Sequence, residues 1–168
     1  MRQRSALSVW GPLALGVGLT LLLGLVAVTG RRGADGEERV AARLIELTND
    51  VRQEHGQSAL SADPRLNHAA KGYAREMASR DWFDHLGPDG STVEQRAEAS
   101  GYRGWAVLAE NLARGPGQPE PAEILDRWLA SPTHRRNVLS PDLTDVGIAC
   151  RAVGERFWCA QEFGARRP

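Results

Sequence analysis

The feature that most constrains this chain is an uninterrupted run of 20 residues without a charged side chain, from Val9 to Val28. A helix rises about 1.5 Å per residue, so this run makes a helix of about 30 Å, the thickness of a bilayer's hydrocarbon core. Arg2 and Arg4 precede the run, as expected for an N-terminus that stays in the cytoplasm. The run therefore predicts a transmembrane helix at about residues 9–28, with the rest of the chain outside the cytoplasmic membrane.

Residues 1–30 are accordingly predicted to be a signal anchor that holds a single-pass protein in the cell membrane. No A-x-A triplet marks a cleavage site near Thr29 and Gly30, which favours an uncleaved anchor. The alternative is a cleaved signal peptide, which would release a secreted domain. Residues 31–36 are predicted to be a short polar linker.

The charge of the chain differs between these two parts. The sequence has 21 basic and 21 acidic side chains in total. Residues 1–30 contain two arginines and no acid, so the remaining residues carry a net charge of about −2. A part without a basic excess is not expected to bind nucleic acid. Its length suits a single compact domain, and we expect a monomer.

After the linker, the hydrophobic pattern changes from helical to strand periodicity, which is typical of an α+β fold. Ser91 and Glu94 form a predicted capping box at the start of one short helix. Helices are predicted, in chain order, at about 40–55, 64–80, 91–101, around 124–128 and from 131 onward. Strands are predicted at 105–113 and in a final hairpin.

The two cysteines of the chain lie in this predicted hairpin. If its turn centres between Gly154 and Glu155, Cys150 and Cys159 face each other directly on the two strands. Directly opposed cysteines lie close enough for a disulfide, and an oxidising compartment favours that bond. Two buried free thiols are the alternative.

Several short motifs follow one another in an order typical of a known family. They are FDHLGPDG at 83–90, GY at 101–102, AENLA at 109–113, WLASPTHRRNVL at 128–139, DVGIA at 145–149 and FWCAQEFG at 157–164. Over residues 37–165 the chain resembles the CAP superfamily of cysteine-rich secretory, antigen 5 and pathogenesis-related 1 proteins, in its short bacterial, SCP-like form. The resemblance implies a three-layer α/β/α sandwich with a central antiparallel sheet.

The resemblance also implies a cleft lined by two histidines and two acids. By motif, His85 and His134 correspond to the histidines and Glu110 to one acid. The second acid is expected shortly after Trp128, where the chain reads LAS at 129–131. We therefore expect three of these four residues, without the second acid.

The chemistry of these residues allows more than one kind of site. Two converging imidazoles suit a divalent ion such as Zn²⁺, so His85 and His134 are candidate metal ligands, although two protein ligands are few for tight binding. Glu110 is the candidate catalytic residue, because it can orient a histidine or take a proton from a bound water. Asn111 and Ser131 complete the predicted ligand cleft.

Three functions stay open on these grounds. We favour an extracytoplasmic binding module, not an enzyme, which holds a small, lipid-like or cell-wall ligand between His85, Glu110 and His134, with or without a divalent metal. The first alternative is a metal-assisted hydrolase of peptide or cell-wall bonds with Glu110 as general base. The second is a purely structural or interaction domain, in which the same side chains form a hydrogen-bonded cluster.

Overall fold

The structure is a computed structural model that describes residues 18–167, with side chains from residue 35 onward. The chain divides into two compact units, Met1–Ala34 and Asp35–Pro168. Helix α1 comprises Gly18–Glu54, so residues 31–36, where the sequence predicts a linker, are helical. Of the predicted signal anchor and its membrane helix at 9–28, residues 1–17 lie outside the described residues. In the part that is described, no helix combines the length and apolarity needed to cross a membrane.

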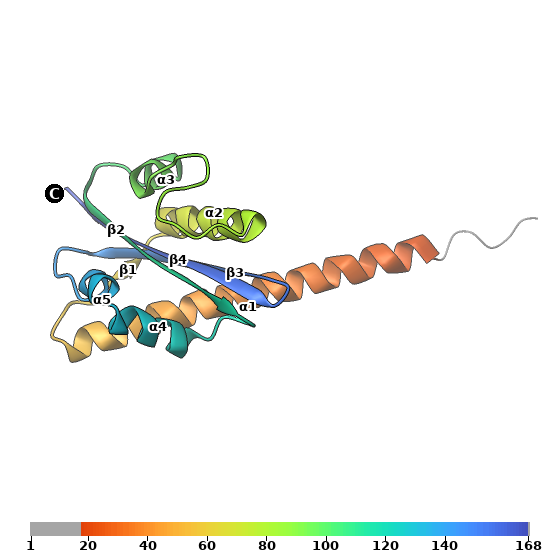
Figure 1. Ribbon diagram of the computed structural model, residues 1–168, viewed down its shortest axis with the longest axis horizontal. Helices are drawn as coiled ribbons and strands as arrows, with labels where there is room; N and C mark the ends of the chain where they lie inside the picture. Colours follow the sequence, from red (N-terminus) through yellow and green to blue (C-terminus); the bar gives the residue numbers. More distant parts are fainter. Residues whose placement is uncertain (1–17, 168) are drawn as a thin grey trace, which may run out of the picture. The chain divides into compact units, whose positions relative to one another are not determined.

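The second unit is an α+β sandwich, as predicted, and its central sheet has four strands (Figure 1). The sheet order is β1-β3-β4-β2, with β1 at Ser61–Ala62, β2 at Trp105–Pro116, β3 at Asp145–Val153 and β4 at Arg156–Arg166. Helices α2 (Pro64–Arg80) and α3 (Val93–Ala99) cover one face of the sheet, while α1, α4 (Pro121–Ala130) and α5 (Pro132–Val138) cover the other.

The sheet differs in one respect from the predicted antiparallel arrangement. The three long strands pair antiparallel, but β1 runs parallel to β3, which makes the sheet mixed. The parallel strand β1 consists of two residues in the connection between α1 and α2. Backbone amides of this connection donate hydrogen bonds to the edge of β3. The Ser61 amide donates to the Thr144 carbonyl at 2.8 Å and the Asp63 amide to the Val146 carbonyl at 2.9 Å.

Alternation along β4 divides the core into two layers, because successive side chains of a strand point to opposite faces. Phe157, Cys159 and Phe163 pack with residues of α1, α4 and α5. Trp158 and Ala160 pack against α2. A strand whose side chains are buried on both faces therefore forms the centre of the sandwich.

Helix α2 lies directly on β3 because Gly147 has no side chain. A Cβ atom at Gly147 would lie 2.1 Å from the backbone nitrogen of Asn67 and 2.2 Å from the carbonyl carbon of Leu66, both in α2. The helix begins after Asp63, whose carboxylate accepts from the first backbone amides, and it ends at Asp81 in the left-handed conformation with φ 48°. This close packing fixes where the loop after α2 starts.

Helix α3 begins one residue later than its predicted capping box. Its capping box consists of Thr92 and Gln95, not Ser91 and Glu94. The Ser91 amide is already occupied, because it donates to the Asp89 carboxylate at 2.9 Å in the preceding turn.

The C-terminal hairpin has the predicted register. Cys150 pairs with Cys159 and Val153 with Arg156 across β3 and β4, and the two cysteines form a disulfide. No free cysteine remains among the described residues, so the alternative of two free thiols is wrong.

Candidate functional site

Glu110 and His85 form the centre of the candidate site. Glu110 lies on β2, the edge strand, and its side chain is only 3% exposed. Its Oε1 atom lies 2.7 Å from Nδ1 of His85, in the loop between α2 and α3. The His85 side chain is 59% exposed. This hydrogen bond to Glu110 raises the pKa of His85 above its usual value, so the buried carboxylate both orients the imidazole and favours its protonated form.

Arg96 of α3 completes the environment of Glu110 and attaches the His85 loop. Its Nη2 atom donates to Glu110 Oε2 at 2.7 Å and to the His85 carbonyl at 3.2 Å. Nη1 donates to the Ser91 carbonyl at 2.8 Å. The guanidinium also stacks on the Tyr73 ring of α2, 3.6 Å from its centroid, and Tyr73 donates its hydroxyl to the Asp84 carbonyl. Two helices therefore hold the loop that presents His85.

His134 belongs to α5 and is attached to β2 through buried amides. The Asn111 side chain donates to the His134 carbonyl at 3.2 Å and to Gln161 Oε1 at 3.0 Å. Asn137 of α5 donates in turn to Asn111 Oδ1 at 2.9 Å and to the Glu110 carbonyl at 3.2 Å. Asn111 is completely buried, so its contribution to the site is to position α5.

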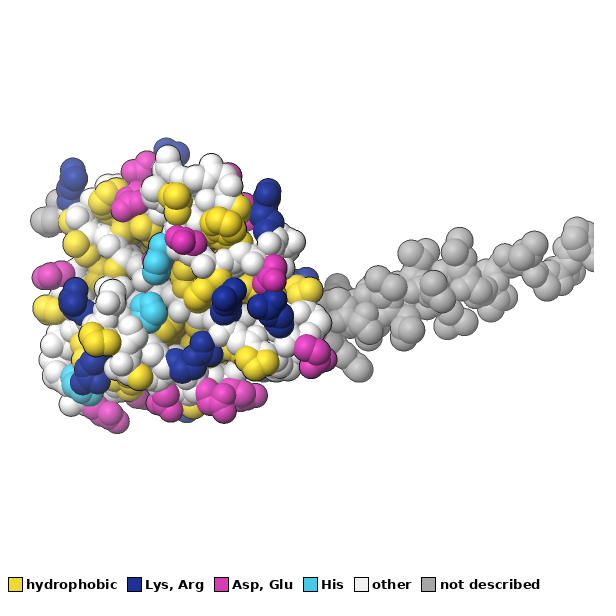
Figure 2. Space-filling model, viewed as in Figure 1, with side chains coloured by type: hydrophobic (Ala, Val, Ile, Leu, Met, Phe, Trp, Pro, Cys, Tyr) yellow, Lys and Arg dark blue, Asp and Glu magenta, His cyan; other side chains and the backbone are white. Residues whose placement is uncertain are grey.

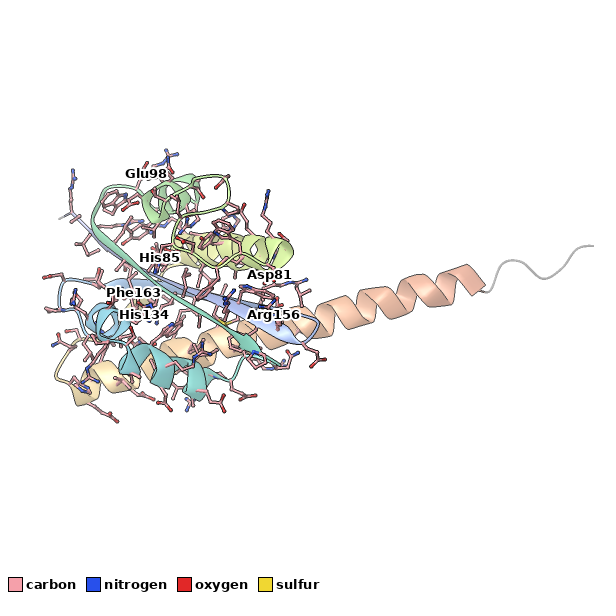
Figure 3. The ribbon with its side chains drawn as sticks, in the orientation of Figure 1. Asp81, His85, Glu98, His134, Arg156 and Phe163 are labelled. Atoms are coloured by element: carbon pink, nitrogen blue, oxygen red, sulfur yellow. A yellow bond between two sulfur atoms is a disulfide. The ribbon has the colours of Figure 1, made fainter. Side chains whose placement is uncertain are left out.

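The two histidines reach the site from opposite layers of the sandwich. Glu110 and Asn111 are consecutive in β2 and point to opposite faces of the sheet. Figure 3 accordingly places His85 and His134 on the two sides of β2, and in the same orientation Figure 2 shows histidine side chains at the surface there. Burial lowers the pKa of His134, and the charge of His85 lowers it further, so His134 favours its neutral form. Because β2 is an edge strand, residues from both layers can meet around it.

Ser131 lies where α4 ends and α5 begins. Its carbonyl accepts from the Arg135 amide at 2.8 Å, and its side chain forms no capping hydrogen bond within the described residues. The structure therefore brings His85 and Glu110 into contact, places His134 across β2, and gives Ser131 a position at a helix junction.

Sequence reasoning missed a second acid, Glu162 of β4. Glu162 is directly opposite Glu110 in the register of β2 and β4 and is completely buried. No hydrogen-bond donor among the described residues reaches either of its carboxyl oxygens. Burial raises the pKa of Glu162 well above its usual value, and the adjacent Glu110 raises it further. The sequence signal that could have identified it is an acid in the segment 157–165, in which Glu162 is the single charged residue and Gln161 the one other polar side chain.

The donor set near the two histidines does not fit a tight zinc site. No group of three or more His, Cys, Asp or Glu side chains in the described part of the chain is arranged to hold a metal ion. Both oxygens of Glu110 already accept hydrogen bonds from His85 and Arg96. Two imidazoles are therefore the available ligands, one fewer than catalytic zinc sites use.

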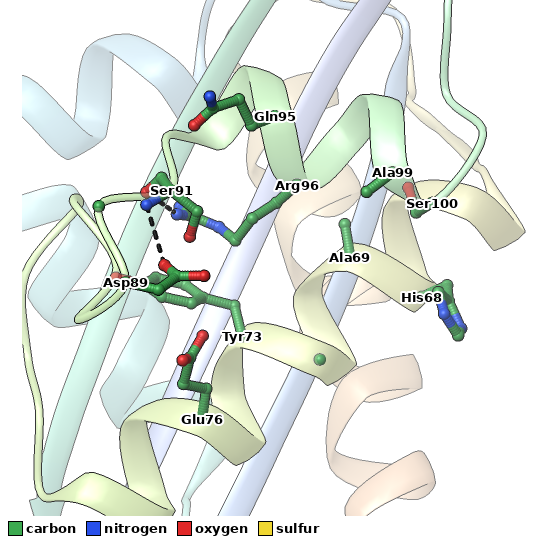
Figure 4. Close-up of a pocket in the computed structure, with 12 residues that line it drawn as sticks. His68, Ala69, Tyr73, Glu76, Asp89, Ser91, Gln95, Arg96, Ala99 and Ser100 are labelled. Carbon is green, nitrogen blue, oxygen red and sulfur yellow. Dashed lines mark hydrogen bonds between the residues drawn. The ribbon is translucent and has the colours of Figure 1, made fainter.

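Arg96 also lines an open groove of about 630 Å³ between α2, α3 and the turn at 89–91 (Figure 4). Tyr73, Glu76 and Gln95 line it together with Arg96. Neither His85 nor His134 is part of its lining. The groove and the histidines therefore share Arg96 but are separate features of the surface.

Comparison with known proteins assigns the chain to a family. Residues 45–163 match the CAP group, the cysteine-rich secretory protein family. The chain belongs to this family. The uncharacterized protein YkwD of Bacillus subtilis is 30% identical over 122 residues, which cover 73% of this chain and 46% of YkwD. The chain thus spans about half the length of this relative.

Two solved structures have a similar fold. An extracellular protein containing an SCP domain from Bacillus anthracis has a TM-score of 0.67 and 27% identity, over 78% of this chain and 41% of that one. An outer surface protein of Borrelia burgdorferi also has a TM-score of 0.67, with 23% identity over 74% of this chain and 90% of that one. These matches agree with the predicted α+β sandwich.

Proposed function

We propose that this CAP domain is a binding module outside the cytoplasm, which holds an anionic group of a cell-envelope ligand between His85 and His134. One observation carries the proposal, the 2.7 Å contact between exposed His85 and buried Glu110. A buried carboxylate that pairs with an exposed imidazole directs the second ring nitrogen, Nε2, away from the core. That nitrogen is free to donate a hydrogen bond to a ligand.

The two histidines suit an anionic group that carries both acceptor and donor atoms. Protonated His85 supplies charge and a donor, which a carboxylate or phosphate accepts strongly. Neutral His134 offers an acceptor nitrogen. Large apolar side chains next to His85 are also exposed, namely Trp82 (39%), Phe83 (37%) and Leu86 (49%). The site therefore suits a ligand whose polar group binds the histidines and whose apolar part packs on these side chains. Lipid-like ligands and cell-wall ligands that carry a peptide have this character.

The location outside the cytoplasm is part of this proposal. The charge-free run at 9–28 favours a membrane anchor. The solved relatives include an extracellular protein and an outer surface protein, and the Cys150–Cys159 disulfide is typical of an oxidising compartment. These three observations support a domain presented outside the cytoplasmic membrane.

The geometry favours binding over hydrolysis. A general base must contact the water that it activates, whereas the carboxylate of Glu110 faces His85 and Arg96, each at 2.7 Å. Glu110 is also only 3% exposed. In this arrangement Glu110 positions His85 and has little access to a substrate.

The test is a titration of the full chain, in which NMR follows the ring signals of His85 and His134. The probes are a soluble disaccharide-peptide fragment of peptidoglycan and vesicles of phosphatidylglycerol, with phosphatidylcholine vesicles as the uncharged control. We expect one anionic probe to shift both histidine signals, which identifies the source of the ligand. Ring signals that do not respond to either probe would overturn the proposal.

Histidine variants test whether the site itself binds. Replacing His85 by Ala removes one charge-assisted hydrogen bond, which corresponds to a loss of affinity of about tenfold or more. Exposed His68 of α2 is the matched control, and His68→Ala is expected to bind like the wild type. Equal weakening by both substitutions would exclude His85 as the specific contact.

A further inference from the structure

Glu162 and Glu110 are two buried carboxyl groups that face each other across β4 and β2. Directly opposed side chains on antiparallel strands lie about 5 Å apart at Cβ, and the register pairs Glu110 with Glu162. Neither side chain is more than a few per cent exposed. Two negative charges at this separation in the protein interior repel each other strongly.

One arginine faces this pair. Arg96 lies 2.7 Å from Glu110 Oε2, but its Nε atom is 3.9 Å from Glu162 Oε1, beyond hydrogen-bonding distance. Arg96 Nε itself has no hydrogen-bond partner among the described residues. The guanidinium therefore compensates the charge of Glu110, and a second buried anion would stay uncompensated.

The other elements packed around Glu162 supply no further buried cation within the described part of the chain. Helix α2 contributes Tyr73, which stacks on Arg96, and α3 contributes Glu94, whose charge opposes ionisation of Glu162. The neighbouring position in β3 is Gly147, which has no side chain. His85, beyond Glu110, is paired with that carboxylate.

We propose that Glu162 is held protonated in the folded domain and donates a hydrogen bond to Glu110, which makes it a positioning residue for the Glu110–His85 pair. Glu110 then receives hydrogen bonds from a histidine, an arginine and a carboxylic acid. Glu162 fixes the orientation of the Glu110 carboxylate, and Glu110 in turn orients the exposed ring of His85. The set of two histidines and two acids that the sequence leaves incomplete after Trp128 thus gains its second acid from β4.

The first experiment measures the ionisation of Glu162 directly. The side-chain carboxyl carbons of the full chain are followed by ¹³C NMR between pH 4 and 8, and the Glu162 signal is assigned by its loss in Glu162→Gln. We expect a Glu162 signal that does not titrate between pH 5 and 8. A titration midpoint near that of an exposed glutamate would overturn the proposal.

The second experiment uses the dependence of stability on pH. A carboxyl group protonated in the folded chain ionises when the chain unfolds above about pH 4.5, so its contribution to stability falls as pH rises. Glu162→Gln removes this effect but keeps a hydrogen-bond donor. We therefore expect its urea midpoint, relative to wild type, to increase steadily from pH 5 to pH 8. A constant difference would show that Glu162 is ionised in both states.

The third readout separates positioning from a purely structural role. The Nδ1 proton of His85, protected by Glu110, is expected to give a slowly exchanging NMR signal in wild type and in Glu162→Gln, and a broadened one in Glu162→Ala. An unchanged signal in Glu162→Ala would disprove positioning. If Glu162 were an anion, Glu162→Gln would instead lower the His85 titration midpoint by about one unit. No ligand is involved, so these results stand apart from the proposed binding function.

Discussion

Nδ1 of His85 lies 2.7 Å from Oε1 of Glu110, so a buried carboxylate orients a histidine that is itself 59% exposed. Arg96 donates a hydrogen bond to the other oxygen of this carboxylate and a second one to the carbonyl of His85. The loop that carries His85 is therefore attached to β2 and α3 at the same point. This relationship determines how the exposed ring can meet a ligand.

The two histidines are predicted to titrate in a definite order. The hydrogen bond to Glu110 raises the pKa of His85, while burial and the charge of His85 lower the pKa of His134. On raising the pH, His134 is therefore expected to lose its proton first. Histidine ring signals in a ¹H–¹³C NMR titration measure both midpoints.

Two variants check the causes of this order. Glu110→Gln is expected to lower the His85 midpoint, and His85→Ala to raise that of His134. The contribution of protonated His85 to stability is full below pH 6.5, its usual pKa, and is lost as pH rises through the raised value. Midpoints in the reverse order would contradict the described contacts.

Replacement of Arg96 by Met is expected to destabilise the domain by about 3–5 kcal/mol, because it leaves a buried carboxylate without its partner. The change also removes the bonds that hold the His85 and Ser91 carbonyls. Urea unfolding of the full chain measures the loss. Exposed Arg75 of α2 is the control, and Arg75→Met is expected to cost less than about 0.5 kcal/mol. Similar losses for both variants would show that Arg96 is not specifically required.

Two glycine substitutions test how closely α2 packs on the sheet. In Gly147→Ala the new Cβ meets the backbone of α2 at 2.1 Å, so we expect a loss of about 3 kcal/mol or more, or no folding. In Gly72→Ala, within α2, the new Cβ has no described atom within 4 Å, and a gain of about 0.5–1 kcal/mol is expected. Thermal unfolding measures both. A neutral Gly147→Ala would exclude direct contact of α2 with β3.

The disulfide between Cys150 and Cys159 is predicted to form when the chain folds under oxidising conditions. Iodoacetamide should label neither cysteine before reduction and both after it, as read by mass spectrometry of the unfolded chain. Loss of the bond is expected to cost about 2–3 kcal/mol, mainly by freeing the unfolded chain. Labelling of either cysteine without reduction would refute the pairing.

Elements that depend on local patterns could be predicted from the residues alone. The predicted helix at 64–80 coincides with α2, and the hairpin register that pairs Cys150 with Cys159 followed from alternation about one turn. Ordered motifs identified the family and selected His85, Glu110 and His134. These signals are local because capping, turn and strand preferences depend on residues near one another in the chain.

Which side chains meet depends on the packing of strands and helices that lie far apart in the chain. Glu162 opposes Glu110 only because β2 pairs with β4, and Arg96 reaches Glu110 only because α3 packs on that face. Asn111, a cleft residue by motif, is completely buried and holds α5. The bond from Asn111 to Gln161 joins residues 50 positions apart. Such partners are selected by strand register and burial, which no local pattern encodes.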